Sequence, residues 1–306
     1  MNGTHDELLE ELRPTAFAIS YRMLGSVAEA EDVVQEALLR LHHALEGDER
    51  IESPRAYLAT VATRLSIDQL RSARVRREAY VGEWLPEPLV ADNAADPARQ
   101  AELADSLSLA FLVLLESLSP EQRAALLLRD VFDYDYAQIA DIVGKSEDNA
   151  RQLAARARRH VDEHRPRFEA SREQRDELAR RFFAAAQEGE LEPLETLLAH
   201  DVVLHGDGGG KAPALARAVQ GRQRVARTLR AWMRQGERIP GAAFRQVEVN
   251  GQPGALILAG QEVIGVMALD IADGQIQEVR SIVNPDKLGH VGQVGDIRAL
   301  LKGPGA

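Results

Sequence analysis

The sequence predicts a multidomain protein with two all-α domains, the second containing a helix-turn-helix, followed by an α+β domain with a curved antiparallel sheet. A length of 306 residues suggests about two domains, or three small ones. Apolar residues recur at helical spacing through much of residues 26–160, whereas alternating strand patterns begin only near residue 201. Helices followed by strands are typical of an α+β arrangement at the C-terminal end of the chain.

Composition and charge narrow the class of protein. Hydrophobic residues make up 45% of the chain and charged residues 28%, which is typical of a soluble, helix-rich globular protein. There is no cysteine, which excludes disulfides and thiolate metal sites, and residues 1–12 lack the apolar run of a signal peptide or membrane span. We therefore expect a cytoplasmic protein with no membrane contact. The net charge of −11 opposes nonspecific coating of nucleic acid.

The first predicted helix covers residues 26–45, with Ser26 as its N-cap. Its apolar positions recur at helical spacing and form one stripe. The opposite side is acidic and interrupted by one aliphatic residue; it comprises Asp32, Gln35, Glu36 and Leu39. Taken alone, such a face is more often simply solvated.

The second predicted helix begins at the pair Ser53 and Pro54, a cap residue followed by proline at the first helical position. One side is apolar. Another side carries the charged residues Arg64, Asp68, Arg71 and Arg74, and an arginine cluster on one face suits contact with phosphates. A solvated surface helix is the alternative for this pattern.

Residues 79–100 predict a linker, because prolines, acids and alanines dominate it without periodicity. It contains the motif WLPEP, formed by Trp84, Leu85, Pro86, Glu87 and Pro88. The two prolines favour extended or turn-like backbone. We expect the tryptophan to dock on another part of the chain rather than to face water.

Further helices are predicted at residues 101–118, 121–131, 136–143 and 146–160. The last two form a candidate helix-turn-helix, because Ala140 allows close helix approach and Gly144 suits the turn. The second helix carries polar and basic residues that could read base edges and hold phosphates, namely Ser146, Asn149, Arg151, Gln152, Arg156, Arg158 and Arg159. An arginine-rich helical hairpin remains the alternative.

The segment after Pro166 predicts two helices and then strands, with Asp273 and Gly274 joining a hairpin. His205 and Asp207 are two residues apart, so on a strand they would share a face, as an acid–base pair of an enzyme would. The glycine-rich stretch at residues 207–211 lacks the outer glycine and Ser/Thr of a P-loop, which favours a contact loop. The eight scattered histidines indicate no metal site.

In this order, the acidic helix, the arginine-bearing helix and the helix-turn-helix resemble the extracytoplasmic-function branch of the bacterial sigma-70 family. Residues 1–78 resemble its region 2, residues 79–100 its linker and residues 101–165 its region 4, about half of the chain. Residues 172–290 are similar to the NTF2-like, or SnoaL-like, cone-shaped fold, with residues 291–306 as a tail. One sigma subgroup with such a fused domain carries three motifs found here: WLPEP, DGGGK (Asp207, Gly208, Gly209, Gly210, Lys211) and NPDKL (Asn284, Pro285, Asp286, Lys287, Leu288).

The resemblance implies a sigma factor that directs core RNA polymerase to −35 and −10 promoter elements, and neither an enzyme nor a cofactor-dependent protein. It assigns the acidic face to the β′ subunit of core polymerase, with β as a further contact, the arginine face to the −10 element and the helix-turn-helix to the −35 element. The three motifs are expected to mediate regulation in cis by the cone. The alternative is a SnoaL-like cyclase or isomerase with a DNA-binding appendage. A small-molecule ligand in the cone is allowed, although no residue cluster in the sequence supports one.

Overall fold

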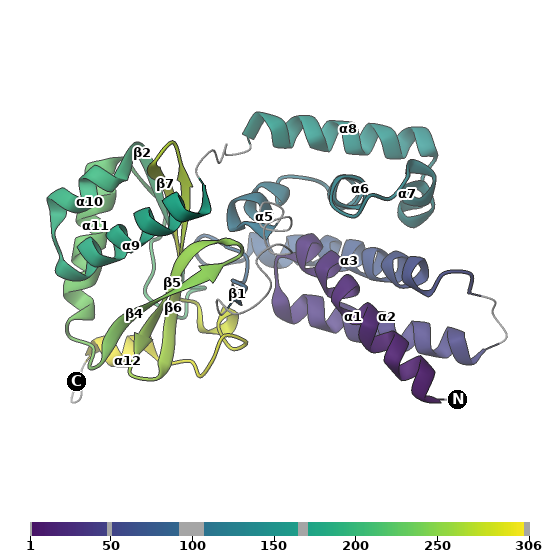
Figure 1. Ribbon diagram of the computed structural model, residues 1–306, viewed down its shortest axis with the longest axis horizontal. Helices are drawn as coiled ribbons and strands as arrows, with labels where there is room; N and C mark the ends of the chain where they lie inside the picture. The colour runs from purple at the N-terminus through teal and green to yellow at the C-terminus, as the bar shows by residue number, and fades with distance from the viewer. Residues whose placement is uncertain (1, 48–50, 92–106, 165–170, 303–306) are drawn as a thin grey trace. The chain divides into compact units, whose positions relative to one another are not determined.

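We describe the protein from a computed structural model, which describes the backbone of residues 2–47, 51–91, 107–164 and 171–302 (Figure 1). The chain forms two compact units. The helical unit comprises Met1–Ala79 and Leu112–Arg165, and the cone unit comprises Tyr80–Phe111 and Pro166–Ala306. The two helical segments that the sequence separates are therefore one unit here, and the residues that join them belong to the cone unit.

The helical unit begins with a three-helix group, α1 (Asn2–Leu24), α2 (Val27–Glu46) and α3 (Pro54–Glu78). The predicted cap is present, because the Ser26 hydroxyl accepts a hydrogen bond from the Glu29 amide at 3.2 Å. The predicted apolar stripe of α2 is buried, including Val34, Ala37 and Leu41. Helix α3 begins at Pro54 as predicted, with the Ser53 hydroxyl accepting from the Ala56 amide.

The second part of the helical unit consists of α5 (Leu109–Leu115, whose first three residues fall in the cone unit), α6 (Pro120–Asp130), α7 (Tyr136–Val143) and α8 (Glu147–His164). Reciprocal capping boxes start α6 at Ser119 and α7 at Asp135. Gly144 ends α7 with φ of 66°, a left-handed conformation that glycine adopts without a steric penalty. The predicted helix-turn-helix is therefore present, and Ile139, Ala140, Ala150 and Ala154 form its buried contact.

The cone unit contains one curved sheet with strand order β1-β4-β5-β6-β7-β2-β3. Its strands are β1 (Val90–Ala91), β2 (Leu198–Asp207), β3 (Val219–Gln220), β4 (Ala242–Val249), β5 (Gln252–Ala259), β6 (Glu262–Ala272) and β7 (Gln275–Ile282). The hairpin between β6 and β7 turns through Asp273 and Gly274, both with positive φ, as predicted. The α+β class is confirmed, but the sheet is mixed rather than antiparallel throughout, because β2 and β7 pair in parallel.

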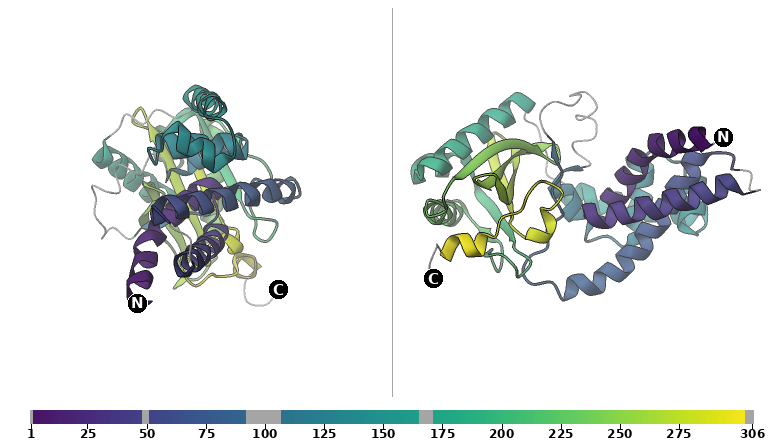
Figure 2. Two further views of the ribbon diagram at one scale, coloured as in Figure 1. Left: turned by 90° about the vertical axis from the view of Figure 1, so that its right-hand side faces the viewer. Right: turned by 90° about the horizontal axis from the view of Figure 1, so that it is seen from below.

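Helices α9 (Arg172–Glu188), α10 (Leu191–Leu197) and α11 (Arg222–Gly236) pack on the sheet (Figure 1). Phe182 and Phe183 from α9 and Leu229 from α11 meet sheet residues such as Leu269 and Val279 in the main apolar core. After β7 the chain forms a single 3₁₀ turn, η1 (Pro285–Lys287), and ends in α12 (Ile297–Lys302), yellow in Figure 2. None of the described helices combines the length and apolarity needed to cross a membrane.

Candidate functional site

The acidic face predicted on α2 lies on the surface of the helical unit. Asp32, Gln35 and Leu39 are exposed and Glu36 is half-buried. Leu39 is 49% exposed, which is unusual for a large apolar side chain among the described residues. Glu36 pairs with Arg40 one turn later at 2.7 Å. An exposed aliphatic residue surrounded by carboxylates suits a partner with both an apolar contact and basic side chains.

The arginines predicted to contact DNA from α3 make contacts with α6 and α7. The Arg64 guanidinium donates to the carbonyl oxygens of Asp141 at 2.7 Å and Ile142 at 3.1 Å, near the end of α7. The Arg71 guanidinium binds Asp68 at 3.1 Å on its own helix and Glu121 at 2.7 Å on α6. The side chain of Arg74 lies outside the described residues. In this arrangement, two nitrogens of each guanidinium donate within the protein: Nε and Nη2 of Arg64, and Nη1 and Nη2 of Arg71.

The predicted recognition helix α8 exposes its polar residues. Ser146 caps it by accepting from the Asn149 amide at 3.3 Å. The remaining predicted residues are all exposed: Asn149, Arg151, Gln152, Arg156, Arg158 and Arg159. Arg151 pairs with Glu147 and lies over the Tyr136 ring, and Arg158 pairs with Asp130. Asn149, Gln152, Arg156 and Arg159 thus present a polar and cationic helix surface that fits a major groove.

Arg123 on α6 is the centre of the contact between the two parts of the helical unit, and sequence reasoning did not find it. Its side chain is buried and donates to the carbonyl oxygens of Met23 and Leu115, each at 2.6 Å. A further bond at 2.9 Å reaches Glu116. Met23 and Leu115 lie in the last turns of α1 and α5, where carbonyls lack partners within the helix and the helix dipole favours a cation. Burial lowers the pKa of Arg123 to about 9, so the side chain is cationic at neutral pH.

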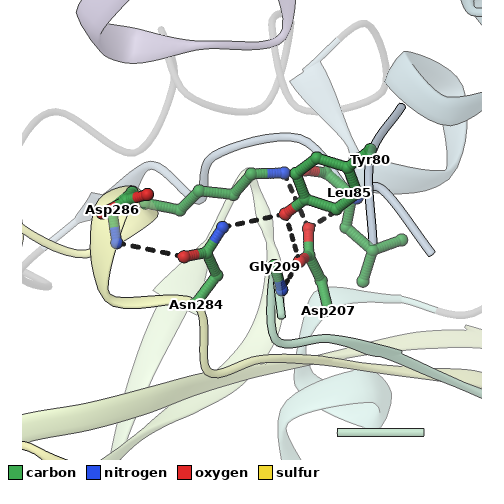
Figure 3. Close-up of polar contacts among 7 residues, drawn as sticks. Tyr80, Leu85, Asp207, Gly209, Asn284 and Asp286 are labelled. Atoms are coloured by element: carbon green, nitrogen blue, oxygen red, sulfur yellow. Dashed lines mark hydrogen bonds and ion pairs between the residues drawn. The ribbon is translucent and has the colours of Figure 1, made fainter. Parts of the chain in front are cut away.

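A linker clasp holds the WLPEP segment within the cone unit (Figure 3). We define it as Tyr80, Leu85, Asp207, Gly209, Asn284 and Lys287. These residues come from three distant parts of the sequence: the linker, the loop after β2 and the turn after β7. The structure thus brings together the three motifs WLPEP, DGGGK and NPDKL that the sequence singles out.

Asp207 is the centre of the linker clasp and is fully buried. Its Oδ1 accepts from the Tyr80 hydroxyl at 2.6 Å and from the Gly209 amide at 3.1 Å. Its Oδ2 accepts from the Leu85 amide at 2.8 Å and from the Lys287 ammonium at 2.6 Å. A buried carboxylate needs such partners, because it has lost its hydration. Burial and this carboxylate raise the pKa of the Tyr80 hydroxyl well above its usual range, so the phenol remains a donor.

Lys287 connects the carboxylate to the tryptophan of the linker. Its ammonium group also donates to the Leu85 carbonyl, and it lies 4.3 Å from the centre of the Trp84 ring and 5.0 Å from that of Tyr80. A partly desolvated ammonium over an aromatic face is attracted by the ring quadrupole. Trp84 is half-buried, and Leu85 is fully buried. The tryptophan of the linker therefore docks on the cone, as the proline-rich sequence around it predicts.

The NPDKL turn and the DGGGK loop fit each other closely. The Asn284 side chain accepts from the Asp286 amide at 3.2 Å and donates to the Tyr80 hydroxyl at 2.8 Å. Gly209 has φ of 56°, and a Cβ there would lie 2.3 Å from the side-chain amide nitrogen of Asn284. Glycine is thus required at this position by both conformation and space. In contrast, Lys211 and Asp286 form an exposed ion pair at 2.6 Å, and Gly208, Gly210, Pro285 and Leu288 complete the two motifs without polar side chains.

The described linker residues after Leu85 are also attached to the cone unit. Pro86, Glu87 and Pro88 are buried, and the His290 ring contacts the Pro88 carbonyl at 2.7 Å. Asn250 forms two hydrogen bonds of 2.8 Å with the Leu89 backbone. Its side-chain oxygen accepts from the Leu89 amide, and its backbone amide donates to the Leu89 carbonyl. Strand β1 then extends the sheet by pairing with β4. The linker is therefore attached to the cone unit from Tyr80 to Ala91, and Val90 and Ala91 form an edge strand of the sheet.

A histidine provides a second attachment of the linker. His205 on β2 lies between two carboxylates, with Nδ1 at 2.6 Å from Glu83 of the linker and Nε2 at 3.4 Å from Glu278 of β7. The buried Arg280 pairs with Glu278 and with Asp270. Burial opposes protonation of His205, as does the charge of Arg280, but hydrogen bonds to the two glutamates prevail and raise its pKa above the usual value.

We expect the linker to loosen over the pH interval above the usual histidine pKa of 6.5, because His205 then loses its charge. A folded pKa above the unfolded one means that the stabilisation is complete below the unfolded pKa and is lost as pH rises through the folded pKa. In a Trp232→Phe chain, which leaves Trp84 as the only tryptophan, the Trp84 emission maximum should move to longer wavelength over this interval. His205→Gln should abolish the pH dependence. An equally large shift in that variant would show that another group is responsible.

The structure places His205 and Asp207, the candidate acid–base pair, at the linker. Both are bound to the linker, and neither lines the cavity that the cone encloses. Among the described residues, no group of three or more His, Asp or Glu side chains is placed to hold a metal ion. The clasp residue that sequence reasoning missed is Tyr80, and it also missed the supporting residues Glu83, Asn250 and His290. The position of Tyr80 just before the WLPEP motif was the only signal available for it.

Comparisons with known proteins cover both units. The family model described as Sigma-70 region 2 matches residues 8–76, and that described as Sigma-70, region 4 matches residues 108–161. A Mycobacterium tuberculosis protein named ECF RNA polymerase sigma factor SigJ is 40% identical over 288 residues, which is 91% of each chain. A probable ECF RNA polymerase sigma factor SigI from the same species is 34% identical over 88% of this chain and 90% of that protein. The crystal structure of the M. tuberculosis SigJ superimposes with a TM-score of 0.74 at 35% identity, covering 92% of this chain and 98% of that one.

Proposed function

Because this chain belongs to the ECF RNA polymerase sigma factors of the sigma-70 family, we propose that α2 binds core polymerase, that α3 and α8 bind the −10 and −35 promoter elements, and that the linker clasp regulates these contacts in cis. In this proposal the protein acts in the cytoplasm, where its polymerase and promoter partners are found. The single observation that supports the regulatory part most directly is the buried Asp207 bound to the linker between regions 2 and 4.

The surfaces of the helical unit support separate roles for α2 and α8. The exposed Leu39 among carboxylates suits a protein partner with basic residues, since opposite charges steer association. The exposed amides and guanidinium groups near the start of α8 suit base edges. Arg64 and Arg71 suit the phosphates and opened bases of the −10 element, but only after they leave their bonds to α7 and α6.

The clasp supports regulation because it controls the segment that connects regions 2 and 4. While Leu85 and Pro86 are buried in the cone unit, fewer linker residues are free to move at the end of the linker that follows region 2. An Asp207→Asn chain tests this role, since promoter-directed transcription should then differ from that of the unaltered chain. An unchanged transcription profile, with the linker shown to be released, would remove the regulatory part of the proposal.

We expect Gln152→Ala to weaken transcription from a cognate promoter while leaving binding to core polymerase intact, because the loss of one good base contact costs about 1–3 kcal/mol. The measurement is in vitro transcription with purified core enzyme, combined with a core-binding assay. Leu39→Ala on α2 is the reciprocal variant, which should weaken core binding without changing the DNA preference. Equal loss of both activities in each variant would contradict the assignment of the two surfaces.

A further inference from the structure

The cone unit encloses an apolar cavity of about 310 Å³, within the range of small-molecule sites in proteins. Its wall is mainly apolar and includes Trp232, Met233, Phe244, Ile257, Ile264 and Met267. Glu237 is the only ionisable residue in the lining, and the polar side chains are Gln187, Gln235 and Ser281. The lining therefore favours an uncharged molecule with few polar groups, since Glu237 is exposed and an ion among the apolar residues would lose its hydration without a counter-charge.

The cavity wall continues into both loops of the linker clasp. Gly206 lines the cavity and precedes Asp207, and Val283 lines it and precedes Asn284. Pro213, Ala214 and Leu215 line it just after the DGGGK loop. The amides of Val283 and Asn284 both donate to the Asp207 carbonyl, at 2.8 and 3.1 Å. A displacement of the cavity wall would therefore move the backbone that positions the clasp.

Helix α12 provides a second connection between the cavity and the clasp. Ile297 and Leu301 line the cavity, and with Leu300 they pack on Ile239 and Ile264. No residue of α12 is fully buried, so the helix is held by this partly covered apolar contact. Between the two lining residues, the Arg298 guanidinium donates to the carbonyl of Gly210 in the DGGGK loop at 2.7 Å. The helix that covers the cavity is thus bonded to the loop that holds the linker.

We propose that the cavity binds a small, uncharged and largely apolar molecule, and that its occupancy is transmitted through α12 and the DGGGK loop to the linker clasp. This inference rests on the proposed regulatory role of the clasp and names the chemical class of its effector. It is a binding role and not a catalytic one. His205, Asp207 and Lys287 are engaged with the linker, and the lining offers one carboxylate without a basic partner among the lining residues.

Two tryptophans make the binding test possible, because Trp232 lines the cavity and Trp84 lies in the linker. In a Trp84→Phe chain, N-phenyl-1-naphthylamine, an uncharged apolar fluorophore, should quench Trp232 saturably. Ala243→Phe places a larger side chain at an exposed position of the lining and should weaken probe binding about tenfold or more through steric exclusion. Ala242→Phe, also exposed and lining, is the second variant if the first lowers stability. Gln246→Phe adds the same side chain to an exposed position of β4 outside the lining and should bind as the parent does.

Quenching that does not saturate, or equal affinity in the parent, both blocking variants and the control, would overturn the binding site.

Transmission is measured in the Trp232→Phe chain with 1-octanol, which is transparent at the tryptophan wavelengths and should displace the probe. Octanol should shift the Trp84 emission maximum, and Arg298→Ala should retain octanol binding but lose most of that shift, whereas Arg227→Ala on the outer side of α11 should not. Binding without any Trp84 response would overturn the transmission while leaving the regulatory role of the clasp untouched, because Asp207→Asn tests that role by transcription without any ligand.

Discussion

Asp207→Asn is expected to destabilise the cone unit by about 3–5 kcal/mol, because removing one partner of a buried ion pair leaves the other charge uncompensated. The substitution keeps the size of the side chain but leaves the buried Lys287 without its anion. It also turns one acceptor oxygen into a donor group facing the Leu85 amide or the Tyr80 hydroxyl, both of which donate to Asp207. Calorimetry should show a fall in melting temperature of about 10 °C for a unit of this size.

Asp286→Asn is the matched control for this experiment. Asp286 lies in the NPDKL motif and pairs with Lys211, but both side chains are more than half exposed. Surface ion pairs contribute about 0–1 kcal/mol, so the control should melt close to the parent. Below the melting transition, the Asp207→Asn chain should also show faster proteolysis between residues 80 and 91 and a change in promoter-directed transcription beyond that of the control. Equal melting shifts in the two variants would show that the buried pair does not hold the linker.

The clasp shows how far sequence reasoning reaches. Trp84 just before two prolines is sufficient to predict docking, since an exposed indole on stiff, extended backbone has no structural reason. The motifs DGGGK and NPDKL were identified by their resemblance to a sigma subgroup, and the structure explains their chemistry: Asp207 and Lys287 are buried partners, whereas Lys211 and Asp286 form an exposed pair. Each motif thus contains one buried and one exposed charged residue, and the local sequence does not show which is which.

The features that the sequence did not predict depend on long-range contacts. Helix α1 was not identified, because Pro14 lies inside it and breaks the local pattern. The parallel pairing of β2 with β7 joins strands separated by most of the cone, and no local periodicity specifies it. Arg123 is another case, because arginine is rarely fully buried and the sequence gives no sign of the two helix ends that it meets.

Arg123→Met is expected to separate the two parts of the helical unit. Methionine fills a similar volume but leaves the carbonyls of Met23 and Leu115 without the donor that they have in the buried contact. Loss of this donor from the buried Met23 carbonyl, and of the nearby positive charge from Glu116, should cost about 1–3 kcal/mol of the packing between α1, α5 and α6, whereas the Leu115 carbonyl keeps its bond from the Leu118 amide. Because Arg64 and Arg71 bind α7 and α6 only across this same contact, their bonds should be lost with it.

The absence of cysteine from the sequence allows a direct measurement of this separation. Gln35→Cys on α2 and Gln152→Cys on α8 are both exposed and would carry a fluorescent donor and acceptor. Transfer efficiency should fall in the Arg123→Met chain, whereas Arg40→Met, which removes only an exposed ion pair with Glu36, should leave it unchanged. An unchanged efficiency in Arg123→Met would mean that the unit stays closed without Arg123. A fall would show that Arg123 maintains the contact in which Arg64 binds α7 and Arg71 binds α6, so that the −10 element competes with these two helices for the same arginines.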